Sequence, residues 1–183
     1  ATTLTFAFWA LATNPDVRER FHAEVDDLDG PPTIDDVADL DVTERIVTET
    51  LRLFPPVYML PRETDTEVLV DGYRLPEDSV VNLPIRVIQR DERFFEAPET
   101  FRPSRWTSDR RTELHDFAYA PFGGGPRICI GRQFALLEAQ LVLATIGREY
   151  ELYWLGDDDD EPPVSPQITT RMPEGQEFLV TER

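Results

Sequence analysis

One stretch of the sequence carries residue types that could bind a metal cofactor: residues 122–131, Phe-Gly-Gly-Gly-Pro-Arg-Ile-Cys-Ile-Gly. It contains Cys129, the only cysteine in the chain. Three consecutive glycines favour a tight turn, and the apolar-rich run 133–146 predicts a buried helix. Cys129 would then lie just before a helix N-terminus, where partial positive charge and free N–H groups stabilise a thiolate. With the fixed charge of Arg127 nearby, such a thiolate suits an axial ligand to heme iron.

The same stretch closely resembles the heme-ligand loop of the cytochrome P-450 superfamily, whose pattern is F-x-x-G-x-R-x-C-x-G. The residues at its fixed positions are Phe122, Gly125, Arg127, Cys129 and Gly131, and all of them match. A lone cysteine beside a glycine turn is more often structural, but matches at every fixed spacing favour the heme ligand. A cysteine nucleophile is disfavoured because the potential bases, His22 and His115, lie in no recognisable context.

The helix expected over residues 41–54 places a carboxylate on its apolar face. Val42, Ile46 and Leu53 lie on that face. Glu49, seven residues after Val42, lies on it too. A buried carboxylate needs a partner, and Arg52, one turn further on, can reach it. The sequence therefore predicts a buried Glu49–Arg52 ion pair instead of a solvated surface pair.

Residues 49–52, Glu-Thr-Leu-Arg, match the E-x-x-R motif of the same superfamily. Residues 101–106 resemble the family's third member of that network, in which an arginine joins the pair and locks the core around the heme. Arg105 occupies the corresponding position, although Ser104 replaces the commoner Glu. E-x-x-R alone is a weak motif, but its order and distance from the cysteine loop support the resemblance.

Short strands are expected over residues 57–83, with a hairpin turn at Asp71-Gly72. A second hairpin is expected near the C-terminus, between residues 167–170 and 177–180. By resemblance, parts of both regions border the substrate. The candidate substrate contacts are Val57, Tyr58, Met59, Leu60, Ile168, Thr169 and Thr170. The resemblance also implies that Arg62 and Arg127 bind the heme propionates; a surface salt bridge is the alternative for Arg62.

The remaining elements follow from turn and cap signals. Further helices are expected over residues 4–12, 16–28, 33–40 and 85–90, and a strand over 150–155. Asn14 is expected to cap the second of these helices, with Pro15 at its first position, and Thr33 the third. Residues 91–121 are polar and proline-spaced, which predicts a long loop, and the acidic run 157–161 predicts a solvated turn.

The composition limits the possible partners. The chain has 183 residues and a net charge of −18, and all 18 of its basic residues are arginine. Such an acidic surface argues against binding to nucleic acid or an anionic membrane, and strong self-repulsion without lysine suggests a halophilic source, where salt screens charge. A single cysteine fits a reducing cytoplasm, and no run reaches the length of a membrane span.

The resemblance covers essentially the whole chain but only the C-terminal half of the family's fold. It implies a mainly α fold with small β-sheets (α+β), with residues 1–183 as a single partial domain. In the family, an acid–alcohol pair in A-G-x-[DE]-T delivers protons to bound oxygen. That threonine would fall just before Ala1, so we assign its role to neither Thr2 nor Thr3. We expect the isolated chain to fold poorly and to be unable to turn over substrate.

The resemblance implies a heme-thiolate monooxygenase that holds heme b (iron protoporphyrin IX) through Cys129 and oxidises a small apolar substrate. Electrons would come from a ferredoxin or a flavin reductase, with Arg45, Arg132 and Arg148 as candidate docking cations. We expect a cytoplasmic monomer. Two alternatives stay open: a peroxide-driven or isomerising heme-thiolate enzyme, and an inactive heme-binding gene fragment. A serine hydrolase or a phosphate-loop protein lacks the required motifs.

Overall fold

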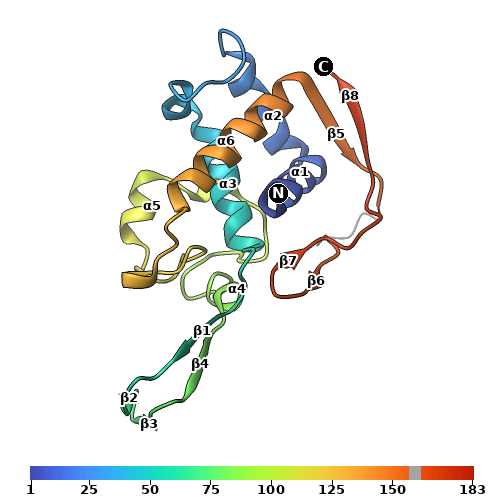
Figure 1. Ribbon diagram of the computed structural model, residues 1–183. Helices are drawn as coiled ribbons and strands as arrows, with labels where there is room; N and C mark the ends of the chain where they lie inside the picture. The colour runs from blue at the N-terminus through green and yellow to red at the C-terminus, as the bar shows by residue number, and fades with distance from the viewer. Residues whose placement is uncertain (157–161) are drawn as a thin grey trace.

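Four long helices form the body of the part of the chain that the computed structural model describes, residues 1–156 and 162–183 (Figure 1). They are α1 (Thr2–Thr13), α2 (Pro15–Asp26), α3 (Asp41–Leu53) and α6 (Arg132–Glu149). The short helices are α4 (Ile85–Ile88) and α5 (Ser108–Glu113), and 3-10 turns occupy Asp36–Asp39, Pro103–Arg105 and Gly125–Arg127. The predicted mainly α fold with small β-sheets is confirmed.

Aromatic rings and one glycine fix how the helices pack. Phe6 of α1 stacks on Phe54, just past α3, with ring centroids 4.7 Å apart and planes 11° apart. Trp9 meets the same Phe54 ring edge-on at 5.8 Å. At the other end of the body, a Cβ on Gly147 of α6 would lie 2.1 Å from the ring of Phe21 on α2. Only glycine therefore allows α2 and α6 to approach this closely.

The strands pair as two-stranded antiparallel ladders. The pairs are β1 (Leu60–Glu63) with β4 (Val80–Leu83), β2 (Val68–Val70) with β3 (Tyr73–Leu75), β5 (Tyr150–Trp154) with β8 (Phe178–Glu182), and β6 (Ser165–Pro166) with β7 (Thr170–Arg171). The first two pairs extend away from the helices as one arm (Figure 1). The β5–β8 pair packs through β5 against α1 on the opposite side of the body.

The predicted hairpin between residues 167–170 and 177–180 is wrong. Thr170 begins β7, which pairs with β6, whereas residues 178–182 form β8, which pairs with β5. Trp154 and Phe178 face each other across that ladder, with their ring centroids 5.1 Å apart. An apolar run can identify a strand but not its partner, and cross-strand side-chain pairs of this kind stabilise one pairing over another.

One of the two predicted helix caps is confirmed in its position. Asn14 is the N-cap of α2 and Pro15 is the first residue of that helix, although the Asn14 side-chain amide donates back to the Ala10 carbonyl at 2.8 Å. Thr33 caps no helix, because its hydroxyl donates to Oδ2 of Asp36 at 2.6 Å in the turn before a short 3-10 segment. Both side chains form a hydrogen bond with a local backbone carbonyl or carboxylate instead of a helix N–H group, as short polar residues often do.

The segment expected as a loop, residues 91–121, contains ordered structure. A 3-10 turn precedes α5, and the Thr107 hydroxyl caps α5 by accepting the Arg110 N–H at 3.2 Å. Phe95, Trp106 and Ala118 form a small buried cluster beneath it. The residues of this cluster all belong to the segment, which is joined to α3 by hydrogen bonds from Arg105 and Trp106 to Glu49.

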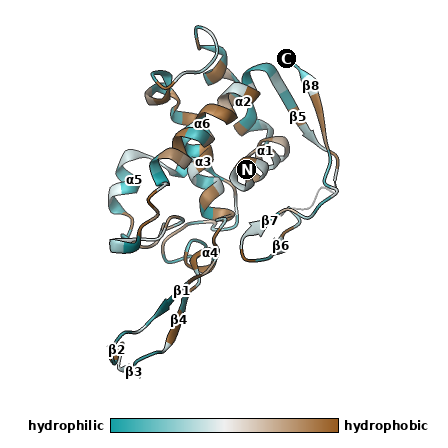
Figure 2. Cartoon of the chain, viewed as in Figure 1, coloured by the Kyte–Doolittle hydropathy of each residue, from teal (hydrophilic) through white to brown (hydrophobic). Residues whose placement is uncertain are grey.

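Hydrophobic and hydrophilic residues alternate along α3 and α6 (Figure 2). None of the helices in the described residues is both long and apolar enough to cross a membrane. The acidic run 157–161 lies outside the described residues.

Candidate functional site

The cysteine loop, residues 122–131, is closed by its own backbone. Gly123 and Gly125 have φ angles of 72° and 65°, in the left-handed region that favours glycine. The Cys129 N–H donates to the Phe122 carbonyl at 2.9 Å, which joins the two ends of the turn. The Cys129 side chain is exposed, and α6 begins directly after the loop. The thiol therefore lies just before a helix N-terminus.

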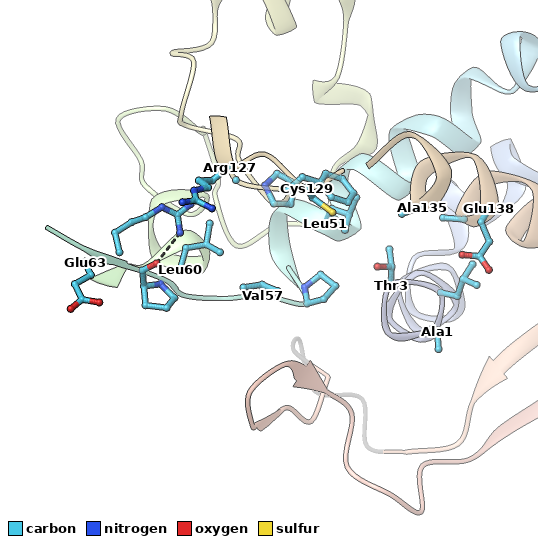
Figure 3. A pocket seen from close by; sticks show the side chains of 18 residues that line it. Ala1, Thr3, Leu51, Val57, Leu60, Glu63, Arg127, Cys129, Ala135 and Glu138 are labelled. Atoms are coloured by element: carbon cyan, nitrogen blue, oxygen red, sulfur yellow. Dashed lines mark hydrogen bonds between the residues drawn. The ribbon is translucent and has the colours of Figure 1, made fainter. Parts of the chain in front are cut away.

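Cys129 lines a cavity of about 760 Å³, a volume typical of small-ligand sites, which span roughly 300–1,000 Å³. The walls come from α1, the end of α3, β1 and the segment leading into it, the cysteine loop and α6. Figure 3 shows Cys129 beside Leu51, with Val57 and Leu60 across the cavity and Thr3 at its far side. Most of the wall is apolar, which suits a hydrophobic ligand.

Two arginines line this cavity without a carboxylate partner among the described residues. Arg62 donates through Nη1 to the carbonyl of its neighbour Pro61 at 2.8 Å. Arg127, on the cysteine loop, forms no hydrogen bond or ion pair within the described part of the chain, and it lies above Leu60 in Figure 3. In so acidic a protein, guanidinium groups that face a cavity unpaired are well placed to bind an anionic ligand.

The other proposed heme-binding positions differ in how they relate to the cavity. Phe122 lines it, whereas Gly125 lines a second hollow of about 480 Å³ on the other side of the loop. Gly131 is the N-cap of α6, and a Cβ built there would lie 3.9 Å from the Cys129 sulfur. The two glycines therefore shape the loop, and Phe122 contributes to the wall.

Only part of the proposed substrate-contact set reaches the cavity. Val57 and Leu60 line it, whereas Met59 is 41% exposed and Tyr58 is half-buried away from it. In the second segment, Ile168 is exposed, Thr169 is half-buried and Thr170 is buried. The Thr170 N–H donates to the Pro56 carbonyl at 2.8 Å, which ties this turn to the segment that enters the cavity wall.

The carboxylate of Glu49 is fully buried and accepts hydrogen bonds from several donors. Arg52 donates to both of its oxygens at 2.9 Å, and Arg105 donates through Nε at 2.9 Å. The Trp106 indole N–H and the Arg102 backbone N–H complete the set, at 2.8 and 3.0 Å. Burial lowers the pKa of Arg105, and the neighbouring Glu49 charge counteracts part of that effect. These residues join α3 to the segment before the cysteine loop.

The candidate docking arginines are not equivalent. Nη2 of Arg45 lies 3.7 Å from Oδ2 of Asp41 on the same helix. Arg148 donates to the Leu28 carbonyl at 2.8 Å and to that of Gly30, so its side chain holds the turn after α2. Arg132 lines the second hollow beside the cysteine loop, is exposed, and has no ion pair within the described residues.

Several cavity and network residues could not be selected from the sequence. Thr3, Glu138 and Ala135 line the cavity because α1 and α6 converge there, which is a tertiary arrangement. Trp106 gave one usable signal, since it lies next to Arg105, but nothing indicated that its indole would bind Glu49. Gln89 is buried among backbone groups and gave no signal at all.

The sequence profile described as Cytochrome P-450 matches residues 1–180. The chain belongs to the cytochrome P-450 family. Cyclooctat-9-en-7-ol 5-monooxygenase of Streptomyces melanosporofaciens is 38% identical over 83% of this chain and 34% of its own length. Cytochrome P-450 3A19 of Capra hircus aegagrus is 32% identical over 93% of this chain and 85% of that sequence.

Solved structures of cytochrome P-450 proteins show the same arrangement. The crystal structure of the cytochrome P-450DA heme domain superposes with a TM-score of 0.90 and 35% identity, over 100% of this chain and 40% of that one. The chain thus spans about a third of the bacterial relative's length and 40% of that heme domain. The resemblance read from the cysteine loop and the E-x-x-R motif is confirmed.

Proposed function

We propose that the protein is a heme-thiolate monooxygenase, which inserts one oxygen atom of O2 into an apolar organic substrate while the other leaves as water. The observation that carries this proposal is the placement of Cys129, Arg62 and Arg127 around one largely apolar cavity. Membership of the cytochrome P-450 family supports it. Because the chain spans only part of its relatives, the activity is proposed for the whole protein.

The residues around the cavity fit heme b (iron protoporphyrin IX). Cys129 offers a sulfur ligand for the iron, and Leu51 and Leu60 offer apolar walls for the ring. Arg62 and Arg127 offer guanidinium groups for the propionates, which they would bind through charge-assisted hydrogen bonds. When bound, heme supplies the oxygen chemistry, and a thiolate ligand pushes electron density toward the iron to favour O–O cleavage.

The chain itself fixes the position of the sulfur. Cys129 lies directly before the N-terminus of α6, where the backbone N–H groups of the first helical turn have no partner within the helix. The backbone of Cys129 is held by the Phe122 carbonyl, so the side chain projects from a fixed point. The wall of the cavity around it is largely apolar.

For the substrate we propose a small, largely hydrocarbon molecule that contacts Val57 and Leu60, with the turn around residues 168–170 nearby. The Streptomyces relative named for 5-monooxygenation of cyclooctat-9-en-7-ol supports this class of substrate. The electron donor is proposed to be a ferredoxin or a flavin reductase that docks beside the cysteine loop, where Arg132 is an exposed cation. We propose that the protein acts as a cytoplasmic monomer.

The decisive experiment is the carbon monoxide difference spectrum of the reduced full-length protein beside Cys129→Ser. We expect a thiolate-type band in the parent protein and its complete loss in the variant, since serine offers no sulfur. A heme spectrum without that band in the parent would overturn the proposal. A parent protein that binds no heme would instead favour the reading as an inactive fragment.

We also propose that the protein is adapted to high salt. The net charge of −18 creates self-repulsion in the folded state, and the Debye length falls from roughly 30 Å at 0.01 M to about 3 Å at 1 M salt. We expect the midpoint of thermal unfolding to rise as KCl increases over that range. Differential scanning calorimetry would measure it, and a midpoint that falls or stays flat would contradict the proposal.

A further inference from the structure

Gln89, in the turn after α4, is completely buried and uses both ends of its side-chain amide. Its Nε2 donates to the carbonyls of Leu51 and Arg52, at 3.0 and 2.9 Å. Its Oε1 accepts the Ala120 N–H at 2.9 Å. The partners fix the orientation of the amide, because a flipped group would place its oxygen against two carbonyls and its NH2 against an N–H donor.

The carbonyls that Gln89 binds belong to the last turn of α3, where a helix leaves such groups without partners. Arg52 and Gln89 each donate to the backbone carbonyl of the other, since Nη1 of Arg52 donates to the Gln89 carbonyl at 2.9 Å. Arg52 is in turn held by the buried carboxylate of Glu49. Gln89 is therefore hydrogen-bonded to the C-terminal end of α3, next to the Glu49–Arg52 ion pair, through both its backbone and its side chain.

The second partner of the Gln89 side chain, Ala120, is connected by backbone hydrogen bonds to Cys129. The Ala120 carbonyl accepts the Gly123 N–H at 2.9 Å, which forms the turn that opens the cysteine loop. The Phe122 carbonyl then accepts the Cys129 N–H at 2.9 Å. A continuous series of hydrogen bonds thus runs from the end of α3, through the Gln89 amide, to the backbone of Cys129.

We propose that Gln89 is a positioning residue for the cysteine ligand: it fixes the start of the cysteine loop against the Glu49–Arg52 core and so keeps the Cys129 sulfur aimed into the cavity. The inference rests on the proposed role of Cys129 as heme ligand. The amide is suited to this task because one group supplies both the donors for α3 and the acceptor for Ala120. Ala120 itself is buried, so its N–H has no access to water as a substitute.

The test compares two variants of the full-length, heme-loaded protein. Gln89→Met keeps the length and apolar stem of the side chain but removes all three hydrogen bonds. Gln89→His keeps one donor and one acceptor on a neutral ring. The matched control is Gln140→Met on α6, since Gln140 is also buried but its Nε2 donates only within its own helix, to Leu136. The readout is the rate at which the thiolate-type band of the reduced carbon monoxide complex converts to the non-thiolate form.

We expect the thiolate-type band of Gln89→Met to convert about tenfold faster than that of the parent. The conversion rate of Gln89→His should lie close to the parent rate, and that of Gln140→Met should equal it. Equal rates in Gln89→Met and Gln140→Met would overturn the inference. If Cys129→Ser loses the band while Gln89→Met behaves like the parent, the ligand assignment stands and only the positioning role fails. If Cys129→Ser keeps the band, the ligand assignment fails and the positioning role fails with it.

A second measurement needs no variant and covers the case in which Gln89→Met does not fold. Amide hydrogen exchange of the parent protein should show Ala120, Gly123 and Cys129 opening together, within about a factor of three in protection. If the Cys129 amide exchanges a hundredfold or more faster than the Ala120 amide, the cysteine loop opens independently of the Gln89 hydrogen bonds, and the inference is overturned.

Discussion

Glu49→Gln is expected to destabilise the folded protein by about 3–5 kcal/mol, the cost of removing one partner from a buried ion pair. The change leaves the guanidinium of Arg52, which is fully buried, without a counter-charge, and Arg105 loses the same partner. It also places an NH2 donor where every neighbour is itself a donor. Urea denaturation, with the midpoint and slope fitted separately, would measure the loss.

The matched control is Glu67→Gln on the β2–β3 hairpin. Glu67 pairs with Arg74 at 3.4 Å, and both side chains are more than half exposed. Such surface pairs contribute little, so we expect a change of less than about 1 kcal/mol. If the two substitutions cost the same, burial of Glu49 is not what makes its ion pairs important, and the network would not explain the stability of this region.

Loss of Arg62 and Arg127 is expected to weaken heme retention by about tenfold for each single change to Gln and about a hundredfold for both. Hydrogen bonds to charged groups contribute about 1.5–3 kcal/mol, and each 1.4 kcal/mol corresponds to roughly a factor of ten in affinity. Both side chains line the cavity without a carboxylate partner among the described residues. Each substitution should therefore remove a contact with the heme and leave the chain's own ion pairs intact.

The rate of heme transfer to an excess of an apo-heme acceptor would measure retention. Arg74→Gln is the control, because Arg74 is exposed on the hairpin arm, away from the cavity. It should transfer heme at the parent rate. Parent-like transfer by the Arg62→Gln, Arg127→Gln double variant would show that the propionates lie elsewhere, even if Cys129 is the ligand.

The features that sequence reasoning predicted well depend on residues close together in the chain. The cysteine loop is one example, since its glycines, its cysteine and the start of α6 lie within a short stretch whose backbone closes on itself. The Glu49–Arg52 pair is another, because one helical turn separates the two residues and the apolar face of α3 shows that they point inward. Local geometry of this kind follows from the order of the residues.

The predictions that failed depended on a choice between partners. β8 is a strand, as predicted, but it pairs with β5, and Trp154 and Phe178 meet across that ladder. Thr33 was expected to cap a helix, but its hydroxyl donates to Oδ2 of Asp36 in the turn before a short 3-10 segment. In both cases the sequence permitted more than one contact, and packing of the chain selected one of them.

The sequence by itself determined the cysteine, the turn that presents it, the helix that follows and the buried acid that pairs with arginine. Each of these is specified by residue types at short, fixed spacings. Only the tertiary structure decided that Arg62 and Arg127 share a cavity with Cys129, that Trp106 binds Glu49, and that Gln89 joins α3 to the cysteine loop. These contacts join distant parts of the chain, and they form because burial leaves each polar group only the partners that the packed helices bring to it.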